Sequence, residues 1–94
     1  MNREGTKLTV SVAGNLDTLT APVLEKELEP ALAGVTELLM DLKDMEYISS
    51  AGLRVLLGAA QVMKKQGTMS VTHVQDEVMD IFKLTKFNTI LNII

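Results

Sequence analysis

Alternating hydrophobic and polar residues in segment 6–14 (TKLTVSVAG) predict a β-strand, because successive side chains of a strand point to opposite faces. Leu8, Val10 and Val12 fall on one side, and Gly14 ends the pattern. We therefore expect a first strand here with one face turned toward a hydrophobic core.

Helical spacing begins at Thr20 and places four apolar residues on one side, Leu24, Leu28, Ala31 and Leu32. Thr20 can cap this helix, and Pro22 is tolerated in the first turn because the amide it lacks has no intrahelical partner there. Pro30 removes one helical hydrogen bond. We expect a kink or an early end near Glu29, with Gly34 closing the segment.

The segment 35–42 (VTELLMDL) is short and almost continuously apolar, which is typical of a strand covered on both faces in a parallel sheet. The helical stripe that follows is the strongest in the chain and consists of Leu53, Leu56, Leu57, Ala60 and Met63. Lys64 and Lys65 in the last turn and Gly67 after it indicate where this helix ends.

The last third of the chain continues the alternation of strands and helices. Residues 68–74 alternate as a strand, Asp76 can cap a short helix that carries Phe82, and the β-rich residues 88–94 predict a terminal strand. This order predicts a single α/β domain over residues 1–94, with a mostly parallel or mixed sheet of about four strands. About three to four helices should cover the sheet through right-handed crossovers.

Two loops stand out in this arrangement, residues 14–20 and 43–50. If the strands before them run parallel, both loops leave the sheet at its carboxyl edge, where α/β proteins usually place their binding sites. We therefore look for functional residues in these two segments.

Composition excludes several function classes. The 94 residues are 47% hydrophobic and 22% charged, which is enough apolar surface for one compact core and argues against disorder. The net charge is -3 and the nine basic residues are scattered, so nucleic acid is an unexpected partner. With no cysteine and a single histidine, His73, we expect neither a metal site nor a cofactor. No apolar run reaches the roughly 18 residues of a spanning helix, so we expect a cytoplasmic protein without membrane insertion.

Enzymatic activity is also unexpected. No G-x-S-x-G element surrounds Ser50, and His73 lies in a separate strand, where it reads as a surface or satisfied polar residue. The chain has no glycine-rich phosphate-binding motif.

Ser49 and Ser50 precede the strong helix directly. The simplest interpretation is that one of them is the N-cap, which stabilises a helix by about 1 kcal/mol. A hydroxyl at this place can also carry a phosphate, because free amides and the helix dipole favour negative charge there. Spacing alone supports both interpretations.

Two motifs carry a family resemblance. The run from Asp41 to Leu57, with its Tyr-Ile-Ser-Ser-Ala-Gly-Leu element, and the upstream Gly-Asn-Leu-Asp and Thr-Ala at residues 14–17 and 20–21 resemble the signatures of STAS domains, specifically bacterial anti-sigma factor antagonists. The resemblance extends over essentially the whole chain.

The resemblance implies a switch in which this protein is a substrate. In such antagonists, an anti-sigma factor that is also an ATP-dependent serine kinase phosphorylates a serine before the Ala-Gly-Leu step, and Ser50 matches that position. The unphosphorylated form binds the anti-sigma factor, and a PP2C-type phosphatase restores this form. Many antagonists carry Asp where this chain has Ser49, which is a second, lesser candidate for modification.

The expected partner-binding residues lie in both loops and at the helix start: Asp17, Asp44, Glu46, Tyr47, Ser49, Ser50, Gly52 and Leu53. For Asp17 the residues leave a second interpretation open, an Asx-turn or cap that leads into the first helix. A different function also stays open, a STAS-like accessory subunit of a transport or signalling assembly that docks without reversible phosphorylation.

Overall fold

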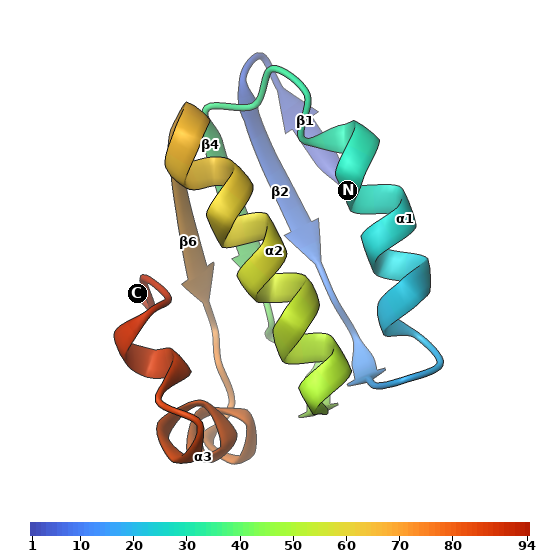
Figure 1. The fold of residues 1–94 in the computed structure, drawn as a ribbon, viewed down its shortest axis with the longest axis vertical. Helices are drawn as coiled ribbons and strands as arrows, with labels where there is room; N and C mark the ends of the chain where they lie inside the picture. The colour runs from blue at the N-terminus through green and yellow to red at the C-terminus, as the bar shows by residue number, and fades with distance from the viewer.

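In the computed structural model, which describes residues 1–94, four strands form a sheet in the order β1-β2-β4-β6. They are β1 (Asn2–Glu4), β2 (Lys7–Ser11), β4 (Glu37–Asp41) and β6 (Thr68–Thr72), drawn as arrows in Figure 1. β1 pairs antiparallel with β2, and the other neighbours are parallel. The predicted mixed α/β sheet is therefore confirmed.

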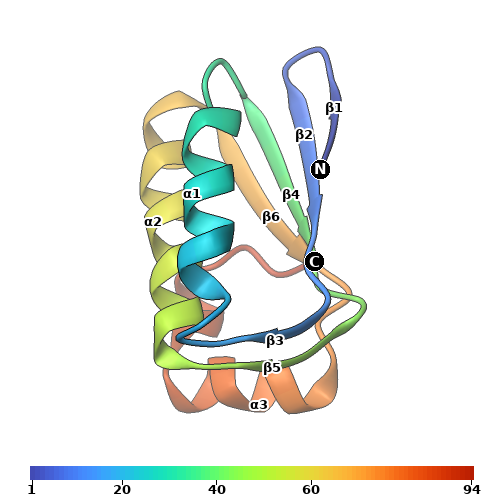
Figure 2. The same cartoon turned by 90° about the vertical axis from the view of Figure 1, so that its right-hand side faces the viewer.

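Two helices cover one face of this sheet. Figure 2 shows α1 (Ala21–Ala31) and α2 (Ser50–Gln66) side by side on that face, while α3 (Asp76–Leu84) closes the end of the molecule. The strand residues turned toward the helices include Leu8, Val10, Leu38, Met40 and Val71. The 21 buried core residues are all hydrophobic, so packing of apolar side chains holds the layers together.

The opposite face of the sheet has no helix over it, as Figure 2 also shows. Leu39 points to that face and is only half-buried, in register with Thr9 and Ser70. The prediction that the strand within 35–42 is covered on both faces was therefore wrong. A run of three apolar residues at 38–40 does not by itself distinguish two-sided from one-sided burial.

A second, two-stranded sheet lies beneath the first and was missed in the sequence. It consists of β3 (Gly14–Leu16) and β5 (Met45–Ile48), which pair in parallel. They occupy the two segments expected to be loops. Figure 2 shows both strands running from the lower end of the main sheet toward the starts of α1 and α2. The predicted first strand ends earlier than expected, because β2 stops at Ser11 and Gly14 begins β3 instead of ending the strand. The backbone of Gly14 has φ +71° next to a register shift, a conformation that glycine adopts readily.

Helix α1 continues through Pro30 and ends at Ala31 instead of stopping near Glu29. The amide of Leu32 still donates to the carbonyl of Leu28 at 3.0 Å, so the last turn stays closed beyond the proline. One missing hydrogen bond is tolerated because Leu28 and Leu32 are buried on the core side of the helix.

Helix α2 agrees with its prediction, with Gly67 at the C-cap, and so does the strand after it. Helix α3 begins one residue earlier than predicted, because Gln75 and not Asp76 is the N-cap and Asp76 is the first helical residue.

The predicted terminal strand at residues 88–94 was wrong. A short 3-10 helix, η1 (Phe87–Thr89), occupies its start, and only Ile93 bridges to Val71 of β6. Lys86, with φ +64°, reverses the chain after α3. β-propensity depends on an available partner edge, and here the reversed chain meets β6 at a single position.

Candidate functional site

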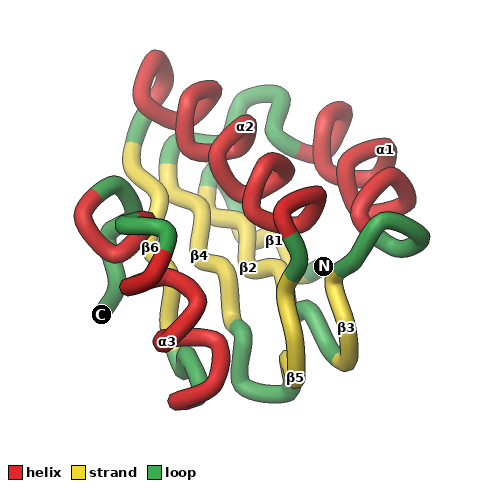
Figure 3. The backbone as a smooth tube through the Cα atoms, turned by 60° about the horizontal axis from the view of Figure 1, so that its bottom comes forward, coloured by secondary structure: helices red, strands yellow, loops and turns green.

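Strands β3 and β5 bring the starts of the two long helices together. Leu16 pairs with Ile48, and the amide of Ser49 donates to the carbonyl oxygen of Leu16 at 2.9 Å. Four residues separate the end of β3 from the start of α1, and Ser49 alone separates the end of β5 from the start of α2. In Figure 3, where the lower end of the molecule comes forward, β3 and β5 lie next to each other below these two helix starts. The two loops expected to share one edge of the sheet are therefore neighbours.

Asp17 organises the first of these segments. One oxygen of its carboxylate, Oδ1, accepts hydrogen bonds from the amides of Leu19 at 2.9 Å and Thr20 at 3.1 Å. These backbone donors hold the pKa of Asp17 below its ordinary value of 3.8. Thr20 occupies the N-cap position, but its hydroxyl makes no capping bond and donates instead to the carbonyl of Asn15 at 2.7 Å. The structure therefore confirms the interpretation that Asp17 forms an Asx-turn before the first helix.

Leu19 is a feature that the sequence reasoning missed. It is 82% exposed, although the hydrogen bond of its own amide to Asp17 fixes its backbone. Tyr47 on β5 is 49% exposed and adds a second large apolar side chain at this end of the molecule. The usable signal in the sequence was a leucine between two threonines in a segment predicted to be a loop, because large apolar residues in loops mark interaction surfaces when they cluster.

Ser50 is the first residue of α2 and is exposed. Ser49 is the N-cap and has the extended backbone of that position, φ -97° and ψ 177°, yet its side chain makes no capping hydrogen bond. Its hydroxyl oxygen is buried without a hydrogen-bond partner. Of the two hydroxyls, only that of Ser50 belongs to an exposed residue, and it lies where the free amides of the helix favour negative charge.

Gly52 and Leu53 are buried, so they position the helix instead of presenting side chains. At Gly52 the helix packs against Leu16 and Ile48 so closely that a Cβ would lie 2.7 Å from the nearest atoms. The absence of a side chain at Gly52 therefore allows the start of α2 to rest on both short strands.

The remaining expected contact residues are exposed residues in or next to β5. Asp44 precedes β5 and is exposed, and its carbonyl accepts a hydrogen bond from the amide of Gly14 at 2.9 Å. Glu46 and Tyr47 are exposed in the middle of β5. We call Asp17, Leu19, Asp44, Glu46, Tyr47 and Ser50 the switch surface.

His73 directly follows β6, which is an edge strand of the four-stranded sheet. It is exposed, and its Nδ1 atom lies 3.1 Å from Oδ1 of Asp41. The backbone amide of Lys43, and to a lesser degree His73, lower the pKa of Asp41. The surface polar interpretation of His73 is confirmed.

The structure contains no group of three metal-ligating side chains, and no helix has both the length and the apolar character needed to cross a bilayer. What the site offers chemically is an exposed hydroxyl at a helix N-terminus, on a protein whose adjoining short strands and loop carry exposed acidic and apolar residues that a second protein could contact.

Known proteins are similar to this chain in sequence and in fold. The family model described as "Mlab, STAS domain" matches residues 1–92. The anti-sigma-B factor antagonist of Bacillus subtilis is 32% identical over 87 residues, which cover 92% of this chain and 80% of the relative. A crystal structure of an anti-sigma factor antagonist from Mycobacterium paratuberculosis superimposes with a TM-score of 0.87 at 25% identity, covering 98% of this chain and 80% of that one.

The fold is shared more widely. The anti-sigma factor antagonist SpoIIAA, at 13% identity, covers 100% of this chain and 84% of its own length with a TM-score of 0.78. Anti-sigma factor antagonists are regulatory binding proteins and not enzymes, in agreement with the expectation from the sequence. The matched family model, the relative from Bacillus subtilis and the shared architecture together show that this chain belongs to the STAS family of anti-sigma factor antagonists.

Proposed function

We propose that this protein is an anti-sigma factor antagonist that switches partners through phosphorylation of Ser50. The unphosphorylated form binds an anti-sigma factor with serine kinase activity in the cytoplasm, and phosphorylation releases it. The observation that carries this proposal is the position of Ser50, an exposed residue that begins a 17-residue helix directly after β5.

Phosphorylation transfers the γ-phosphoryl group of ATP to the hydroxyl of Ser50. The Oγ atom of Ser50 attacks the γ-phosphorus of ATP, a new P–O bond forms, ADP leaves, and a base of the kinase takes the hydroxyl proton. A PP2C-type phosphatase reverses the modification by hydrolysis, which returns the serine and releases inorganic phosphate. The antagonist supplies only the acceptor hydroxyl.

The electrostatic consequence explains why the fold survives and the complex does not. A phosphate adds roughly -1.5 to -2 charge and three acceptor oxygens. The start of α2 tolerates it because unpaired amides and the helix dipole favour negative charge. A partner that fits the neutral hydroxyl of Ser50 and also contacts Asp17 and Glu46 then meets an additional negative charge on the same protein.

A mass measurement and a binding measurement test the proposal together. Protein isolated from its own cells should carry a phosphatase-sensitive phosphoryl group on Ser50. Ser50→Asp should melt within a few degrees of the wild type but lose about tenfold or more of its affinity for the anti-sigma factor. Ser50→Ala should keep that affinity and lose the phosphoryl group.

A second function is favoured by one detail of the site, the buried hydroxyl of Ser49 that has no hydrogen-bond partner. If an acidic residue at this position orients the acceptor serine in relatives, this chain lacks it and could dock permanently in a transport or signalling assembly. A protein that stays unmodified in all growth conditions and co-purifies with a membrane ATPase would establish this alternative. Recovery of phosphorylation in Ser49→Asp would instead support the switch.

A further inference from the structure

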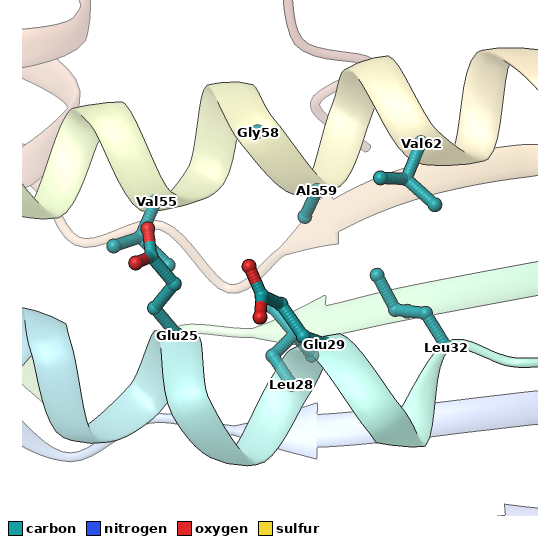
Figure 4. A pocket seen from close by; sticks show the side chains of 8 residues that line it. All are labelled: Glu25, Leu28, Glu29, Leu32, Val55, Gly58, Ala59 and Val62. Atoms are coloured by element: carbon teal, nitrogen blue, oxygen red, sulfur yellow. The ribbon is translucent and has the colours of Figure 1, made fainter.

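The outer sides of α1 and α2 enclose a groove of about 290 Å³ that the switch surface does not include. Its apolar wall consists of Leu28, Leu32, Val55, Ala59 and Val62, and Gly58 leaves a gap in the α2 side. Figure 4 shows these residues facing one another across the space between the two helices. Val62 is 42% exposed, and a Cβ at Gly58 would meet no atom within 4 Å. The other four apolar residues are core residues at most 5% exposed and form the floor of the groove, which opens to solvent at Gly58 and Val62.

Two carboxylates border this apolar groove. Glu25 and Glu29 reach from α1 toward α2, as Figure 4 shows, and both are exposed. The ion pair recorded in the structure joins His73 to Asp41, so neither glutamate has a cationic partner. Because they are four residues apart on one helix, their side chains project from the same side, about 6 Å from each other at the Cβ atoms.

We propose that this groove docks a basic amphipathic helix of a partner protein. Apolar side chains of such a helix would enter between α1 and α2, and Lys or Arg at positions i and i+4 would pair with Glu25 and Glu29. The proposal does not depend on phosphorylation of Ser50, since none of the groove residues belongs to the switch surface.

Two other occupants fit less well. A second copy bound symmetrically would place Glu25 and Glu29 against the same glutamates, and like charges across an interface are unfavourable. A small molecule fits less well, because the groove lies at the lower limit of the roughly 300–1,000 Å³ that ligand pockets usually measure and its carboxylates Glu25 and Glu29 are exposed to water. A basic amphipathic helix fits better than a second copy or a small molecule, because it carries both the positive charge and the short apolar surface that complement the groove.

The test uses a synthetic amphipathic helix of about 25 residues made only of leucine and lysine, well above the roughly 12–15 residues below which isolated helices are marginal in water. Binding to the full chain labelled with ¹⁵N should shift the amide signals of residues 25–32 and 55–62. Gly58→Leu places a side chain in the groove at a position where a Cβ meets no atom within 4 Å, and it should raise the Kd about tenfold. Glu25→Gln together with Glu29→Gln should raise it about fivefold.

Matched controls separate docking from general attraction to an acidic protein. Gln61→Leu adds the same side chain on the opposite flank of α2, and Glu27→Gln with Glu77→Gln removes the same charge elsewhere. Each should change the Kd less than about twofold. Failure of the lysine peptide to bind, shifts that lie outside the groove, or equal binding of a peptide with glutamate in place of lysine would overturn the proposal. Concentration-dependent shifts of the groove signals without peptide would overturn it in favour of a second copy.

Discussion

Gly52 of α2 lies directly against the carbonyl oxygen of Leu16 on β3, and a Cβ built at Gly52 would be 2.7 Å from that oxygen. The contact ties the helix start that carries Ser50 to the strand that leads into the first loop. Since the oxygen belongs to the backbone, it cannot move aside without disturbing the pairing of Leu16 with Ile48. The geometry of the switch surface therefore depends on a residue that has no side chain.

Gly52→Ala should destabilise the protein by about 1–3 kcal/mol because the added methyl overpacks this contact. Gly58→Ala is the matched control on the same helix, where a Cβ meets nothing within 4 Å. It should stabilise by about 0.5–1 kcal/mol through better helix propensity. Urea unfolding of both variants checks the prediction, which would be wrong if the two substitutions changed the free energy of unfolding in the same direction.

Ser49→Ala should cost less than the loss of about 1 kcal/mol that is usual when an N-cap serine is removed. The Ser49 hydroxyl makes no capping bond, and its buried oxygen lacks any partner, so its removal relieves an unsatisfied polar group. We expect a melting temperature equal to or above that of the wild type. A drop that corresponds to 1 kcal/mol or more would show that the hydroxyl does cap α2 in solution.

Asp17 should make stability depend on pH in the acid range. Its pKa in the folded protein is lowered by the amides of Leu19 and Thr20, so the ionised form stabilises the fold fully above the ordinary value of 3.8. This contribution is lost as the pH falls below 3.8 and through the folded pKa. The stability difference between wild type and Asp17→Asn should therefore shrink toward low pH. Faster amide exchange at Leu19 and Thr20 in the variant would accompany it, and a difference independent of pH would contradict the assignment.

Pro30→Ala should stabilise the protein by about 1 kcal/mol, because alanine restores a helical amide in the last turn of α1 and the exposed proline ring contributes little packing. The gain is smaller than in a helix centre because proline also restricts the unfolded chain. Pro22→Ala, in the first turn, is the control and should be neutral or slightly destabilising. Thermal unfolding distinguishes the two, and equal effects at both positions would contradict the prediction.

Much of the fold was predictable from local patterns. The alternation in Leu8 and Val10 and the stripe from Leu53 to Met63 identify a strand and a helix, because one buried face of a regular element imposes its own period on the sequence. The position of Ser50 at the start of that helix was also predictable from the sequence. Such features depend on residues close together in the chain.

What the sequence by itself determined is therefore the order of the main elements and the candidate serine at the start of α2. The tertiary structure alone decided that β3 and β5 form a second sheet, that the helices cover a single face, and that Ser49 stays unpartnered while Leu19 is exposed. The reason is physical: strands of three or four residues become stable only when a distant segment pairs with them, and burial of a side chain is set by which element packs over it. The groove between α1 and α2 has the same origin, since two helices separated in sequence create it only when both rest on the sheet.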